Sequence, residues 1–139
     1  MAKSGTLVSV VTGVVAFLVG LSVCFFTIGP AMFADGPTSE RFVVLGVGAL
    51  IMFSLGMAGG ALAPRRYRLV GVWLAAPAVL VFLFFAVSGG LPIEFIVLGV
   101  AFVVAYFAAA LFGAWLAART RLRKLSAAAA EGSMSEPRV

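Results

Sequence analysis

Ala63-Pro64-Arg65-Arg66-Tyr67-Arg68 is a short basic stretch between two long segments that carry no charge. The uncharged segment before it covers residues 42–63, and the one after it covers residues 69–88. A helix needs about 20 apolar residues to cross a bilayer, and both segments reach that length. Because proline disrupts a continuing helix, the basic stretch predicts a turn between two membrane-spanning helices.

Two further uncharged runs of spanning length lie at residues 7–34 and 95–118. The chain is 63% hydrophobic and only 11% charged, whereas a soluble domain carries roughly 25% charged residues. The runs are apolar on every face, unlike the alternating strands of a membrane barrel. We therefore expect an all-α integral membrane protein, a four-transmembrane-helix bundle over residues 1–124, followed by a cytoplasmic tail at 125–139.

Breaker-rich segments separate the helices on the other side. Residues 35–41 read as a charged turn, and a Gly-Gly-Leu-Pro segment interrupts the chain before Glu94. Gly29-Pro30 should kink or end the first helix. The first run is longer than the core of a signal peptide, which spans about 7–15 residues, so we interpret it as an uncleaved helix.

The distribution of charge predicts the orientation. Short cytoplasmic loops are enriched in Lys and Arg. The turn after the second run and the segment after the fourth carry seven basic residues and no acid: Arg65, Arg66, Arg68, Arg119, Arg121, Arg123 and Lys124. The other two loops hold Asp35, Glu40, Arg41 and Glu94. We therefore predict a multi-pass protein of the cell (plasma) membrane with both termini in the cytoplasm. Trp73 and Trp115 fall near the basic side, as interfacial anchors do.

The seven basic residues have two interpretations. They set the topology, and they also form a candidate surface for anionic lipid, because each juxtamembrane Lys or Arg contributes about 1 kcal/mol near an anionic leaflet. The position of the charges accounts for the formal net charge of +5 without nucleic acid, which we do not expect as a partner.

Two segments resemble each other inside the chain. Phe42-Val43-Val44-Leu45-Gly46-Val47-Gly48 matches Phe95-Ile96-Val97-Leu98-Gly99-Val100-Ala101 at five positions. After one inserted residue, Leu62-Ala63-Pro64-Arg65 aligns with Leu116-Ala117-Ala118-Arg119. The match indicates either a tandem duplication of a two-helix hairpin, with copies at 7–68 and 69–124, or the chance similarity of sequences built from few residue types. A duplicated hairpin would place the copies in parallel orientation.

Small residues recur at helical spacing and predict close helix packing, because helices in lipid associate by van der Waals contact. The predicted packing positions are Gly56, Gly60, Ala101, Ala105, Ala109, Gly113 and Ala117. A shorter stripe in the first run comprises Ser9, Gly13, Ala16 and Gly20. Such faces serve either packing within one bundle or a seam between two copies.

Two residues inside the predicted helices have an open role. Pro77 removes a backbone hydrogen bond in the third helix, which produces a tolerated bend or a hinge. The hydroxyl of Tyr106 lies mid-membrane and needs a partner, for which Thr12, Ser22 and Ser54 are candidates.

Catalytic chemistry is hard to assemble from this sequence. There is no histidine, and the single cysteine, Cys24, lies in the first apolar run. A catalytic cysteine needs an activating base. No acid or base lies deep in any run, although such residues mark most transport paths; Glu94 sits at the outer boundary and fits a helix start. We expect no enzyme, no cofactor, no metal site and no catalytic residues.

Two functions remain. The first is a small structural or accessory membrane protein, whose partners are the lipid bilayer and either another membrane protein or its own copies. The second is an oligomeric channel or transporter for a neutral or apolar solute. If the side chains of Tyr106, Ser22, Thr27 and Ser54 meet in one cavity, transport is favoured; if they scatter, packing is favoured.

Overall fold

The computed structural model describes the backbone of residues 2–33, 38–89 and 92–134, and the side chains of residues 10–31, 39–88 and 92–129. Within these ranges the chain forms α1 (Ala2–Phe33), α2 (Thr38–Leu62), the short 3-10 helix η1 (Pro64–Arg66), α3 (Tyr67–Gly89) and α4 (Ile93–Met134). Four helices are long and apolar enough to cross a membrane, with mean hydropathies between 2.2 and 2.6.

The helix ends differ from the expected ones in three places. α1 continues through Pro30 to Phe33. α2 begins at Thr38, so residues that we expected in the turn form its first turn, where Glu40 favours the positive end of the helix dipole. α4 continues to Met134, through the alanines of the predicted tail. The predicted turn at residues 34–37, the break at 90–91 and the tail beyond 134 lie outside the described residues.

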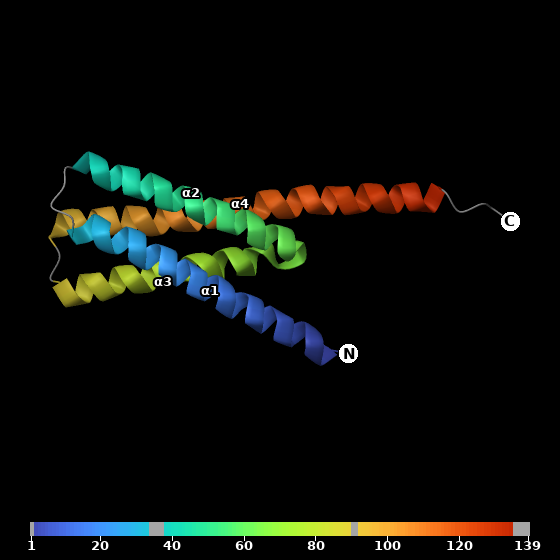
Figure 1. Ribbon diagram of the computed structural model, residues 1–139, viewed down its shortest axis with the longest axis horizontal. Coiled ribbons are helices and arrows are strands. Elements are labelled where there is room, and N and C mark those ends of the chain that lie inside the picture. Colours follow the sequence, from blue (N-terminus) through green and yellow to red (C-terminus); the bar gives the residue numbers. More distant parts are fainter. Residues whose placement is uncertain (1, 34–37, 90–91, 135–139) are drawn as a thin grey trace.

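Successive helices run in opposite directions, so α1 and α3 share one direction and α2 and α4 the other (Figure 1). The beginning of α1, η1 and the end of α2 lie at one end of the bundle, and α4 projects beyond that end. The most extensive packing joins α2 with α4 and α1 with α3, that is, helices that run in the same direction. α3 also packs against α4.

Glycine sets the closest approaches in both pairs. A Cβ on Gly20 would overlap the Leu74 carbonyl, and Cβ atoms on Gly56 and Gly60 would overlap the carbonyls of Ala110 and Ala114. Each of these three contacts joins residues 54 positions apart: 20 and 74, 56 and 110, 60 and 114. Both pairs of helices are therefore aligned in the same register.

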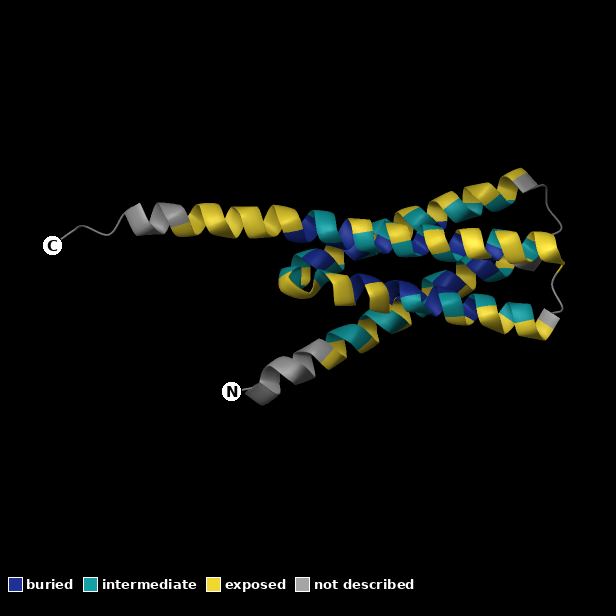
Figure 2. Ribbon diagram, turned by 180° about the vertical axis from the view of Figure 1, so that it is seen from behind, coloured by how far each residue is buried: buried dark blue, intermediate teal, exposed yellow. Residues whose placement is uncertain are grey.

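The interior is apolar and lies where the four helices converge (Figure 2). The buried core consists of Cys24, Ile28, Ala31, Met52, Leu74, Ala75, Ala78, Val81, Phe102, Tyr106 and Ala110. Large apolar side chains are exposed on the outer faces of all four helices. The described side chains of α4 from Arg119 onward are exposed, because this part of the helix extends beyond its neighbours.

Candidate functional site

The seven predicted basic residues come together at one end of the bundle. Arg65 and Arg66 belong to η1, Arg68 lies in the first turn of α3, and the other four follow on α4. All seven are exposed. We call this region the basic end. The two acids whose side chains are described, Glu40 and Glu94, lie in the first turns of α2 and α4 at the opposite end.

Arg121 differs from its neighbours because it ties two helices together. Its guanidinium donates a hydrogen bond to the backbone carbonyl of Ala61, near the C-terminal end of α2. The last carbonyls of a helix lack partners within the helix, and a cation there interacts favourably with the helix dipole. Arg121 therefore holds the beginning of the projecting part of α4 against the end of α2.

Two other arginines lie against aromatic rings. The guanidinium of Arg119 lies 5.2 Å from the ring centre of Trp115. That of Arg68 lies 5.8 Å from the ring of Tyr67, and its Nε donates a 3.1 Å hydrogen bond to the Tyr67 hydroxyl. A cation over an aromatic face is stabilised by about 0.5–1 kcal/mol at exposed sites. The two pairs come from different helices, α4 and α3.

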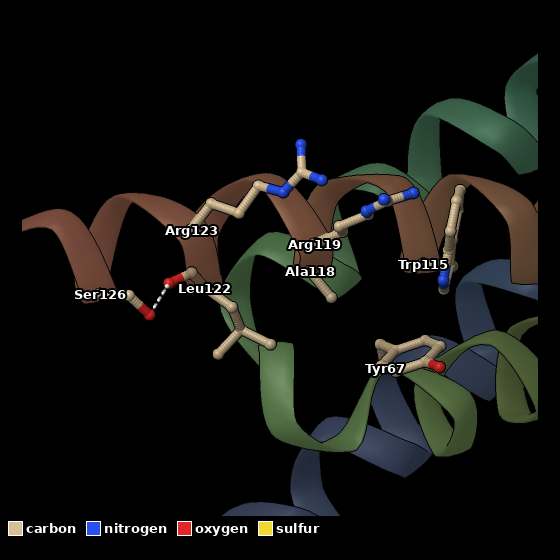
Figure 3. Close-up of a pocket in the computed structure, with 7 residues that line it drawn as sticks. All are labelled: Tyr67, Trp115, Ala118, Arg119, Leu122, Arg123 and Ser126. Carbon is tan, nitrogen blue, oxygen red and sulfur yellow. Dashed lines mark hydrogen bonds between the residues drawn. The ribbon is translucent and has the colours of Figure 1, made fainter.

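An open groove of about 580 Å³ lies between these two helices at the basic end (Figure 3). Tyr67 forms one wall from the start of α3, and Trp115, Ala118, Arg119, Leu122, Arg123 and Ser126 contribute from α4. In the close-up the Tyr67 ring lies across from Ala118 and Leu122. The Ser126 hydroxyl donates to the Leu122 carbonyl at 3.0 Å. The groove therefore combines an apolar floor with cationic side chains.

A second groove of about 590 Å³ lies at the same end, between η1 and α4. Arg65 and Arg66 line it, together with Leu122 and Leu125. It shares Leu122 and Ser126 with the first groove but has no aromatic wall. The basic end thus has two cationic grooves of similar size, of which only one is bounded by aromatic rings.

The interior holds one polar side-chain pair among the described residues. The Tyr106 hydroxyl donates to Thr27 Oγ1 at 2.7 Å, and the Thr27 hydroxyl donates in turn to the Val23 carbonyl at 2.7 Å. The partner of Tyr106 is thus Thr27 and none of the three candidates we had considered. A Cβ on Gly48 would overlap the Tyr106 hydroxyl, so this glycine makes room for it.

Ser22 and Ser54 do not join this pair. Both side chains are exposed, and each donates to a carbonyl of its own helix, Leu18 at 3.0 Å and Leu50 at 2.9 Å. Of the four hydroxyl-bearing residues whose convergence would favour transport, two meet and two scatter to the outside.

The predicted small-residue positions divide into two groups. Gly56, Gly60 and Gly113 are buried against backbone atoms of the facing helix, and Ala117 is also buried. Ala105 and Ala109 are half-buried, and Ala101 is exposed. The cause is geometric: four residues turn an α-helix by about 40° more than a full turn, so a row at every fourth position leaves the interface.

Two residues singled out earlier lie in the core. Pro77 is buried within an α3 that continues on both sides of it. Cys24 is fully buried with a free thiol. On α1, Gly13 contacts the Trp73 ring at 3.6 Å and Gly20 packs on Leu74, so α3 covers this part of the small stripe. Ser9 lies outside the described side chains.

The aromatic wall of the groove was missed in the sequence, although its signal is present. Phe112, Trp115, Arg119 and Arg123 follow one another at spacings of three and four residues, which places them on one face of a helix. We had counted the arginines by side of the membrane and not by face of the helix.

Comparison with known proteins gives limited information. Residues 8–65 match the model of a family of unknown function (DUF6954). The matched segment covers most of α1, all of α2 and the beginning of η1. No curated protein and no solved structure matches the chain significantly.

Proposed function

We propose that the chain is an integral membrane protein of four spanning helices, located in the cell membrane with both termini in the cytoplasm. Two observations support this. Large apolar side chains cover the outside of all four helices, which water would oppose and lipid would not. The basic residues gather at the end of the bundle where α1 begins and α4 projects, and cytoplasmic segments are rich in Lys and Arg.

We also propose that the bundle is a tandem duplication of a helical hairpin. The common register of 54 residues in the α1–α3 and α2–α4 pairs supports this, because a two-fold axis along parallel helices brings each residue opposite its own counterpart. The same offset aligns Gly59 with Gly113 in sequence. The family match to residues 8–65 spans one hairpin unit, which gives further support.

Within this frame, we propose a structural or accessory role: the protein associates with other membrane helices or with its own copies. The observation that carries the proposal is the filled interior. The core is built from apolar side chains, and the glycines bring backbones into contact. The interior polar pair, Tyr106 and Thr27, is satisfied by its own hydrogen bonds.

A transport path would be built differently. Transported solutes need a hydrated or polar route, and ionisable residues in the membrane usually mark it. No buried charged or polar residue lies among the described side chains apart from the tyrosine and threonine hydroxyls. The bundle itself therefore offers proteins its outer faces and solutes no passage.

The test is photo-crosslinking in native membranes from outward-facing positions. A photoreactive amino acid replaces one exposed residue on each helix in turn: Leu18, Leu50, Leu83 or Val104. We expect a defined protein adduct from one or two of these positions, identified by mass spectrometry as another membrane protein or a second copy. The buried Met52 is the matched control and should yield only internal products.

The opposing result is equally clear. A monomer that gives no protein adduct from any of the four positions would contradict the proposed role. Flux of a neutral solute into liposomes that contain the purified protein would favour the channel instead.

A further inference from the structure

One face of α4 changes character along its length. Phe112, Trp115, Arg119 and Arg123 lie on that face, and we call them the α4 stripe. Its first half is aromatic: Phe53 of α2 stacks on Phe112 with ring centres 6.1 Å apart, and Phe112 stacks on Trp115 at 5.7 Å. Its second half is cationic and begins with Arg119, which lies over the Trp115 ring. An apolar surface thus leads directly into a positive one.

The groove between α3 and α4 borders the cationic half of the stripe (Figure 3). Tyr67 closes it from the side of α3, and Leu122 contributes an apolar side chain. Phe112 remains 56% exposed, so the aromatic surface continues outside the groove along the bundle. The cationic half begins where the uncharged run 95–118 ends. In a membrane this is the level of the lipid phosphates.

The positive charge of the stripe has no described carboxylate near it. The acids with described side chains lie at the opposite end of the bundle. Arg121 is engaged by the Ala61 carbonyl, whereas Arg119 and Arg123 are exposed beside the groove. Paired arginines suit phosphate recognition, because the guanidinium matches phosphate oxygens with two parallel donors.

We propose that the α4 stripe and its groove bind one anionic phospholipid. Arg119 and Arg123 hold the phosphate and headgroup, the Tyr67 and Trp115 rings contact the glycerol region, and an acyl chain lies along Phe112. A soluble phosphate would use the arginines alone and leave the aromatic half without a role. An amphiphile uses both halves. This inference rests on the proposed membrane insertion, but not on the proposed association with other proteins.

The two tryptophans allow a direct test with the full-length protein. Trp73 lies near the basic end on α3 and packs against Phe17 of α1, away from the stripe; it is 48% exposed. In Trp73→Phe only Trp115 fluoresces, and in Trp115→Phe only Trp73 does. Each variant is reconstituted in phosphatidylcholine vesicles that contain a small fraction of either brominated phosphatidylglycerol or brominated phosphatidylcholine, whose bromines quench nearby tryptophan.

We expect brominated phosphatidylglycerol to reach Trp115 at least about fivefold more effectively than brominated phosphatidylcholine, since one basic residue near anionic lipid is worth about that factor. Trp73 should show a much smaller preference. An equal preference at the two tryptophans would overturn the proposal, because general attraction to the basic end would then account for it. Absence of quenching at both tryptophans by either lipid would contradict membrane insertion itself.

Charge variants in the Trp73→Phe background locate the site. Arg119→Gln with Arg123→Gln should reduce the preference at Trp115 to the level at Trp73. Arg65→Gln with Arg66→Gln removes the same charge from the same end, beside the second groove, and should leave most of the preference. Equal losses in the two double variants would overturn the proposal. So would displacement of the brominated lipid by inorganic phosphate, which would identify a soluble anion as the ligand. The comparison of the two tryptophans needs neither double variant to fold.

Discussion

The contact between α2 and α4 at Gly60 can be tested by adding a single methyl group. In Gly60→Ala the new Cβ would stand 2.7 Å from both the Cα and the carbonyl carbon of Ala114. Carbon atoms pack best at about 3.5–4.0 Å, so the helices must separate by about 1 Å. A gap of that size removes roughly a quarter to a half of each dispersion contact around it. Overpacking of this kind costs about 1–3 kcal/mol.

Gly46 provides the matched control on the same helix. A Cβ there meets nothing within 4 Å. Alanine is better than glycine inside a helix by roughly 0.5–1 kcal/mol, so Gly46→Ala should unfold at the same or a higher free energy. The two variants make the same chemical change, and only the facing backbone differs.

The assay is unfolding of the purified protein in mild detergent by increasing dodecyl sulfate, followed by circular dichroism and tryptophan fluorescence. We expect Gly60→Ala to unfold at a lower dodecyl sulfate fraction than the parent, and Gly46→Ala to unfold at the same or a higher one. If Gly60→Ala is as stable as Gly46→Ala, α2 and α4 do not make the close contact described here.

Three further predictions concern the interior, the topology and the end of α4. Thr27→Val leaves the buried Tyr106 hydroxyl without an acceptor and should cost about 1–3 kcal/mol of unfolding free energy, more than Tyr106→Phe, which removes one hydrogen bond of about 0.6 kcal/mol; the same unfolding assay ranks them, and the reverse order would contradict the hydrogen-bond chain. In intact cells, a membrane-impermeant maleimide should label Glu94→Cys from outside and Ser126→Cys only after lysis, while the buried Cys24 stays unlabelled; labelling of both engineered cysteines from one side would refute the topology. Truncation after Ser126 removes only residues beyond the packed bundle, so the unfolding free energy should change by less than about 0.5 kcal/mol, and a larger loss would show that the end of α4 supports the fold.

The helices themselves could be predicted from the sequence because their signal is local. Uncharged runs of spanning length predict where helices lie, and Pro64 with its arginines predicts where the chain turns. The ends were less predictable, since the polar residues at the start of α2 and the alanines after residue 125 fit a helix as well as a loop. Charge also predicted which loops share an end of the bundle.

The contacts between helices could not be predicted because they join distant residues. The partner of Tyr106 lies 79 residues away, and several hydroxyls in the chain had an equal claim to it. The row from Ala101 to Ala117 looked like one continuous interface, but its positions rotate around the helix. Only its later residues remain in contact with α2.

The aromatic half of the groove illustrates a different limit. Trp115 was recognised as an interfacial anchor from its distance to the arginines, which is a statement about depth. Its stacking on Phe112 and the approach of Tyr67 depend on how α3 and α4 pack. Depth in the membrane is visible in a sequence, but the arrangement of helices around the bundle axis is not.

The register of 54 residues between paired helices also has a consequence for biosynthesis. Ribosomes add about 5–20 residues per second, so α2 is complete roughly 3–10 s before its partner surface on α4 exists. During that interval the backbone face around Gly56 and Gly60 has no partner within the chain. α1 and α2 pack against each other less extensively than either packs on its later partner. The first hairpin therefore enters the membrane as a loosely joined pair, and the bundle closes only when the second hairpin arrives.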